Sequence, residues 1–123
     1  MEGSAIVWRL GLSASWTDWP NRRLLPRAFY PRPEKDKKGL SVIPAEAGLK
    51  YAIHGATERE PSAVAALQVE QVVSLGLQVC KDNRRHARIV GVPPQPTADD
   101  ALLEFFRLTT ELARKTTIVW PEA

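Results

Sequence analysis

The sequence has few of the residues on which several kinds of function depend. Among its 123 residues there are one cysteine, Cys80, and two histidines, His54 and His86. A single cysteine cannot form an internal disulfide, and three scattered side chains do not supply the three or four ligands of a zinc site. We therefore expect no bound metal, and a cytoplasmic location rather than an oxidising compartment.

Long hydrophobic runs are also missing. The apolar stretch near the N-terminus, residues 5–12, is interrupted by Arg9 and is too short for a signal sequence or a membrane span. No glycine-rich loop follows a strand pattern and opens a helix, so the sequence has no phosphate cradle of the dinucleotide or Walker type. We expect neither membrane association nor a cofactor.

Length and composition predict one folded domain over residues 1–123. A chain of 13.7 kDa is large enough for one core and too short for two, and its 44% hydrophobic and 25% charged residues are ordinary for a globular protein. Short β-branched or alternating runs predict strands, at residues 5–12, 40–43, 64–67, 77–80 and 86–92. The last two are expected to pair as a hairpin across a polar loop of about four to six residues.

Helical periodicity predicts two helices. One is short, near residues 68–75, with Gly76 as its expected C-cap. The other, 98–115, has a long apolar stripe, and Thr97 is its expected N-cap. The predicted fold is therefore α+β, a small mixed or antiparallel sheet covered on one face by a long C-terminal helix and a short helix.

Two further segments fit more than one structure. Residues 48–54 fit either an extended piece or one helical turn, and residues 116–120 fit either a terminal strand or a tail pressed against the core.

Residues 13–38 show neither helical nor strand periodicity and contain four prolines. We therefore expect a long irregular loop whose aromatic rings pack on the core.

Positive charge gathers in two short segments. Residues 22–38 hold seven basic side chains against two acidic ones, and residues 81–88 hold four against one. Because the formal net charge of the chain is only +3, the rest of the sequence is net acidic. Two basic segments therefore interrupt a mildly acidic body.

The loop that contains the first basic segment, residues 13–38, is also rich in aromatic rings, which predicts an interface with another protein. Rings and guanidinium groups dominate protein interfaces because they bury a large area with little loss of entropy. The predicted partner-binding residues are Trp16, Trp19, Arg22, Arg23, Arg27, Phe29, Tyr30 and Arg32. On this evidence the favoured function is a non-catalytic accessory or adaptor protein that docks to another protein subunit.

Nucleic-acid binding is the main alternative. Basic side chains interleaved with rings let a groove neutralise phosphates while bases stack. The candidate contacts are Lys35, Lys37, Lys38, Arg84, Arg85, His86 and Arg88.

Catalysis is the weaker alternative, and we assign no catalytic residue. A nucleophilic mechanism requires a serine or cysteine beside a base that a third group orients. Cys80 lies on the alternating run 77–80, which is more typical of a packed side chain, and histidines such as His54 and His86 more often fix turns. An enzyme, for example a small nuclease-type toxin built around His86, is therefore less expected than a binding protein.

Several short motifs resemble those of a family of small bacterial proteins to which no activity is attached. They are the Phe-Tyr-Pro-Arg run at 29–32, Leu-Ser-Val at 40–42, Leu-Gly-Leu at 75–77 and the His-Ala run at 86–91. The likeness spans roughly residues 20–115, but Arg85 stands where the family pattern has a serine before the histidine. The resemblance implies a bacterial accessory protein, plausibly encoded in a mobile-element or defence locus.

Overall fold

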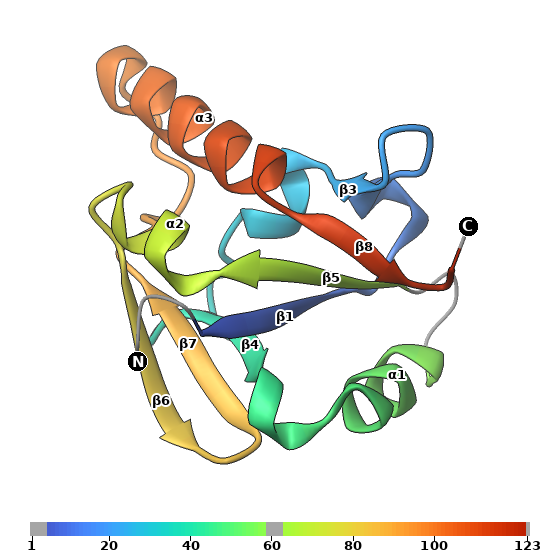
Figure 1. Ribbon diagram of the computed structural model, residues 1–123. Coiled ribbons are helices and arrows are strands. Elements are labelled where there is room, and N and C mark those ends of the chain that lie inside the picture. The colour runs from blue at the N-terminus through green and yellow to red at the C-terminus, as the bar shows by residue number, and fades with distance from the viewer. Residues whose placement is uncertain (1–4, 59–62, 123) are drawn as a thin grey trace.

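The computed structural model describes residues 5–58 and 63–122, and the predicted α+β fold is confirmed (Figure 1). Six antiparallel strands form one sheet in the order β6-β7-β4-β1-β5-β8. Their bounds are Ile6–Gly11 (β1), Leu40–Pro44 (β4), Ala63–Gln68 (β5), Gln78–Asn83 (β6), His86–Val90 (β7) and Thr117–Trp120 (β8). The segment at 116–120 is thus a terminal strand, on the edge of the sheet beside β5.

The two predicted helices lie on one face of the sheet, as expected, and a third helix covers the other face. The long helix α3 (Asp99–Arg114) and the short helix α2 (Val69–Val73) contribute to the larger core cluster. Helix α1 (Leu49–Thr57) packs on the opposite face, where Ala52 and Ala56 contact a second cluster that includes Trp8. The open choice at residues 48–54 is therefore resolved as a helix. None of the helices in the described parts of the chain is long and apolar enough to cross a bilayer.

Two predicted caps and one loop are corrected. Ala98, not Thr97, is the N-cap of α3 and makes no side-chain cap bond, and Ser74, not Gly76, is the C-cap of α2. The hairpin loop is shorter than expected because β6 continues to Asn83 and β7 begins at His86. Asn83 Oδ1 accepts a hydrogen bond of 2.9 Å from the Arg85 backbone N–H, which closes this tight turn.

Residues 13–38 are irregular but firmly packed. They contain two short 3-10 helices, η1 (Ala14–Trp16) and η2 (Pro26–Phe29), and the two-residue strands β2 (Thr17–Asp18) and β3 (Arg23–Leu24), which pair with each other. Helix η2 lies against α3. The segment is thus a layer of the fold and not a free loop.

A buried arginine joins this layer to the sheet. Arg9 on β1 is only 4% exposed. Its Nε and Nη2 donate to the Ala28 carbonyl at 3.1 and 2.8 Å, and its Nη1 donates to the Ser41 carbonyl at 2.7 Å. The guanidinium also lies 5.6 Å from the centroid of the Trp16 ring. Burial lowers the pKa of Arg9 to about 10.

Candidate functional site

Three neighbouring strands bring a serine, a histidine and an aspartate into one hydrogen-bonded row. Ser41 lies on β4, His86 begins β7 and Asp82 is near the end of β6. Ser41 Oγ is 3.2 Å from His86 Nε2, and His86 Nδ1 is 2.6 Å from Asp82 Oδ2. Because an ionised carboxylate only accepts, Nδ1 carries a proton toward Asp82, and Nε2 of the neutral ring accepts from the Ser41 hydroxyl.

A β-bulge places Asp82 in this row. Lys81 pairs with Ala87 and Asn83 pairs with His86, so Asp82 is the extra residue on β6 at this point of the ladder. A bulge bends its strand and redirects the side chain of the unpaired residue. The carboxylate therefore reaches both His86 and Arg88 of β7.

Arg88 fixes the Asp82 carboxylate in its ionised form. Arg88 Nε donates to the two carboxylate oxygens at 3.1 and 3.0 Å. The hydrogen bond from Arg88, followed by that from His86 and the charges of both groups, holds the pKa of the Asp82 carboxyl below its usual value. Arg88 Nη1 also donates to the Lys38 carbonyl at 3.0 Å, which ties the preceding loop to β7.

These side chains line an open hollow of about 570 Å³. Its other wall comes from the loop that leads into β4. The lining has four cationic side chains and only two carboxylates. The cations are Lys35, Lys37, Lys38 and Arg88, and the carboxylates are Glu34 and Asp82.

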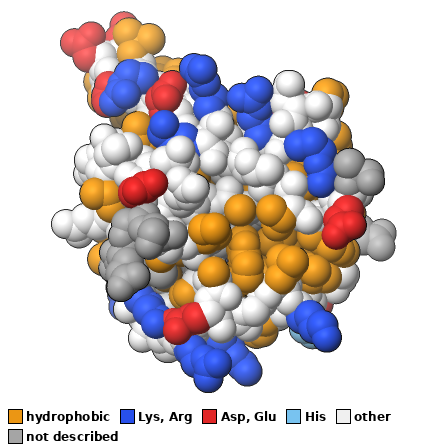
Figure 2. Space-filling view, in the orientation of Figure 1, with side chains coloured by type: hydrophobic (Ala, Val, Ile, Leu, Met, Phe, Trp, Pro, Cys, Tyr) orange, Lys and Arg blue, Asp and Glu red, His pale blue; other side chains and the backbone are white. Residues whose placement is uncertain are grey.

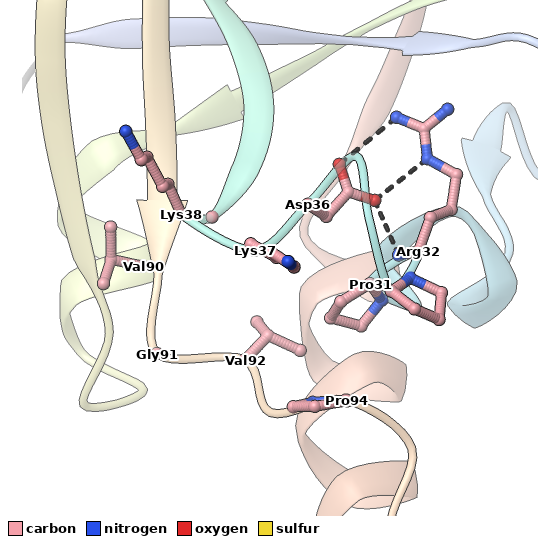
Figure 3. A pocket seen from close by; sticks show the side chains of 11 residues that line it. Pro31, Arg32, Asp36, Lys37, Lys38, Val90, Gly91, Val92 and Pro94 are labelled. Atoms are coloured by element: carbon pink, nitrogen blue, oxygen red, sulfur yellow. Dashed lines mark hydrogen bonds and ion pairs between the residues drawn. The ribbon is translucent and has the colours of Figure 1, made fainter.

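An ion pair holds the lysine-bearing loop in shape. Figure 3 shows the Arg32 guanidinium against the Asp36 carboxylate, with Nε–Oδ2 at 2.9 Å and a further bond of 2.7 Å from the Arg32 backbone N–H to Oδ2. Burial raises the pKa of the Asp36 carboxyl, but the hydrogen bonds and charge of Arg32 outweigh it and the pKa ends below its usual value. The same view shows side chains of this loop facing the segment that contains Val92 and Pro94. The smaller hollow between them has a volume of about 250 Å³.

An apolar niche adjoins the other side of the Ser41–His86 pair. It has a volume of about 90 Å³ and is lined in part by Trp8, Leu10 and Ile43, together with Ser41 and His86 themselves. Figure 2 shows apolar side chains gathered over β1 and toward α1. The serine and the histidine thus lie between a basic hollow and an apolar surface.

The rings predicted to bind a partner are largely part of the fold. Phe29 is 0% exposed, so its prediction as a contact residue is wrong, because η2 places it in the core. Trp16 is half-buried against the same core, and Tyr30 packs on Phe105 with ring centroids 4.9 Å apart. Trp19 is the exception, with 37% of its surface exposed.

The predicted partner-binding arginines do not share one surface role. Arg22 Nη2 donates to the carbonyls of Ile118 and Pro121 at 3.1 and 2.7 Å, which fastens this segment to the edge of β8. Arg32 pairs with Asp36 as described above. Arg23 is half-buried, and Arg27 is exposed on η2.

The predicted nucleic-acid contacts, by contrast, converge. Five of them line the hollow, namely Lys35, Lys37, Lys38, His86 and Arg88. Arg84 and Arg85 lie apart at the hairpin tip, where the Arg85 guanidinium is 5.1 Å from the centroid of the Tyr51 ring.

Sequence reasoning missed Ser41 and Asp82 as site residues. Ser41 belongs to the Leu-Ser-Val motif, and it reaches His86 only because β4 pairs with β7. Cys80 is half-buried opposite Arg88 in the β6–β7 ladder. In residues 5–58 and 63–122, no three histidine, cysteine or carboxylate side chains lie close enough together to hold a metal ion.

Comparison with known proteins adds no relative. No family model, no curated protein and no solved structure matches the chain. The resemblance to the bacterial family therefore stays a prediction, and the functional argument depends on the site alone.

Proposed function

We propose that the chain binds single-stranded nucleic acid in the basic hollow. The observation that carries this proposal is the meeting of the two basic segments, which are some fifty residues apart in sequence, in one concave surface. Neutralising backbone phosphates with lysine and arginine is the main source of affinity for nucleic acids. Four cations around one hollow are enough to hold a short stretch of backbone.

The two sides of the site would contact different parts of a bound strand, its phosphates and its bases. Arg88 is held by Asp82 and by the Lys38 carbonyl, so it can present a guanidinium with little further loss of side-chain entropy. The apolar niche with Trp8 lies just beyond His86. An unpaired base can stack on such a ring only when it is not in a duplex, which favours a single strand.

The test is binding of a labelled oligonucleotide, measured by fluorescence anisotropy over a range of salt concentrations. We expect affinity to fall linearly with salt on logarithmic axes, with a slope of about 0.7 for each phosphate neutralised. The double variant Lys37→Ala/Lys38→Ala should reduce this slope by about 1.4. A matched control with the same loss of charge is Lys50→Ala/Arg114→Ala, on α1 and α3, which should keep the wild-type slope.

Three results would contradict the proposal. They are a complete absence of binding at low salt, an equal loss in both double variants, and a preference for duplex over single-stranded oligonucleotides. The second of these would mean that net charge alone attracts the ligand.

Docking to a partner protein stays a second candidate because several large apolar side chains remain on the surface. Trp19 is exposed on the β2–β3 turn, and Leu103 and Phe106 are exposed on α3, Leu103 by 69%. Purification of the native protein at moderate salt tests this candidate. A co-purifying subunit that is lost with Trp19→Ala or Leu103→Ala would support it, and elution as a lone monomer would oppose it.

A further inference from the structure

We propose that Ser41 is a nucleophile that cleaves a phosphodiester bond of the bound strand, with His86 as its base and Asp82 as the group that orients the base. The proposal rests on the proposed binding function, since the same hollow holds the substrate. It assigns chemistry to Ser41 and Asp82, which sequence reasoning did not place in a site.

The first argument is the order of the hydrogen bonds. A nucleophilic serine requires a base within hydrogen-bond reach, and that base requires a third group that fixes its tautomer. Ser41 Oγ is 3.2 Å from His86 Nε2, and His86 Nδ1 is 2.6 Å from Asp82. All three residues lie on paired strands, which hold catalytic groups more firmly than loops do.

The second argument is the support behind the orienting group. The two hydrogen bonds from Arg88 Nε hold the Asp82 carboxylate in place while it accepts the proton-bearing nitrogen of His86. An aspartate that is held ionised keeps the histidine in the tautomer whose Nε2 faces the serine. A surface pair of His86 with Asp82 would use only Nδ1 and would not require the Ser41 hydroxyl at Nε2.

The third argument is the charge around the nucleophile, which selects the substrate class. Lysine and arginine side chains stabilise the charge that spreads over the equatorial oxygens of a phosphoryl group in its transition state. Arg88 and three lysines line the hollow into which Ser41 opens. This lining favours a phosphodiester over an uncharged ester.

The reaction balances without a co-reactant other than water. His86 Nε2 takes the hydroxyl proton as Ser41 Oγ forms a bond to phosphorus, and the bond from phosphorus to the leaving oxygen breaks. That oxygen leaves on the opposite side and takes a proton from a lysine of the hollow, which is reprotonated from solvent. The protonated His86 then releases its proton to solvent. In the second step neutral His86 removes a proton from water, the hydroxide forms a bond to phosphorus as the bond from phosphorus to Ser41 Oγ breaks, and His86 gives that proton to Ser41 Oγ.

The first test is covalent labelling with a fluorophosphonate, a probe that phosphonylates activated serines with loss of fluoride. Intact-mass and peptide analysis should find one label, on Ser41. Labelling should be absent in Ser41→Ala and at least about 10³-fold slower in His86→Gln, as expected when the base of such a triad is lost. Ser15→Ala, on the exposed 3-10 helix η1, is the matched control and should label normally. Labelling elsewhere, or none at all, would overturn the inference.

The second test separates cleavage from binding. Wild type should cleave end-labelled single-stranded DNA as well as RNA, while Ser41→Ala should bind both with unchanged Kd and cleave neither. The positioning residue is tested with Asp82→Asn, which should lower kcat by about 10²-fold or more, a far larger change than in KM.

Each remaining outcome has a defined meaning. Binding without cleavage or labelling would overturn this inference and leave the binding function standing, whereas absence of binding would overturn the binding function itself. Cleavage of RNA alone, with a 2′,3′-cyclic phosphate product and full activity in Ser41→Ala, would show that the substrate's own hydroxyl is the nucleophile and would refute the role of Ser41.

Discussion

Replacing Arg9 by methionine should destabilise the fold by about 3 kcal/mol. The guanidinium makes three hydrogen bonds to the carbonyls of Ala28 and Ser41, each contributing about 2 kcal/mol for a charged donor. Against this stands the cost of burying the charge, which lowers the pKa of Arg9 well below its usual value, to about 10, and corresponds to roughly 3 kcal/mol. Methionine fills a similar volume but leaves both carbonyl oxygens without this donor.

Urea unfolding followed by tryptophan fluorescence measures this change. We expect the midpoint to fall with an unchanged m-value, and the Tm to fall by about 12 °C for a chain of this size. Arg27→Met, on the exposed surface of η2, is the matched control and should stay within about 0.5 kcal/mol of wild type. An Arg9→Met protein as stable as the control would refute the view that this arginine joins the 13–38 layer to the sheet.

Two further predictions concern the loop that carries the lysines. Gly39→Ala should lower the free energy of unfolding by on the order of 2 kcal/mol and weaken oligonucleotide binding. Gly39 has φ +131°, and an added Cβ would lie 2.8 Å from the Ile89 carbonyl oxygen. The control Gly48→Ala, with positive φ but open space around it, should lose less stability in the same urea assay. Asp36→Asn should destabilise by about 2 kcal/mol at pH 7. Because the folded-state pKa of Asp36 is lowered, its contribution is fully present above the unfolded value of about 4 and is lost as pH falls through the lower folded value. The difference in stability between wild type and variant should therefore shrink as unfolding is measured at decreasing pH below about 4. A difference that persists unchanged at pH 3 would contradict the assigned role of the carboxylate.

The elements that local patterns encode were predictable. The β-branched and aromatic side chains of residues 5–12 anticipated β1, and the apolar stripe of residues 98–115 anticipated α3 almost to its ends. Helix α1 was not decided, because its nine residues are too few for a clear period and its position depends on Ala52 and Ala56 meeting a distant strand. Long-range packing, not local preference, determines this element.

The site was only half predictable for the same reason. The basic residues of the hollow could be recognised from charge density, and Lys37 and Arg88 were both candidates. Their meeting, however, depends on β7 pairing with β4, a strand order that no local pattern contains. The row from Ser41 to Asp82 depends in addition on a bulge of one residue in β6. Which rings of residues 13–38 stay on the surface was not predictable, because the core that buries Phe29 forms only in the folded chain.

A crystal structure of the protein with a short single-stranded oligonucleotide tests the central claim most directly. The account predicts a backbone phosphate within hydrogen-bond distance of Arg88 and of at least one of Lys35, Lys37 and Lys38, with Ser41 Oγ facing phosphorus. An oligonucleotide bound only at the hairpin tip of Arg84 and Arg85, or over Arg27, with the hollow left to solvent, would contradict it.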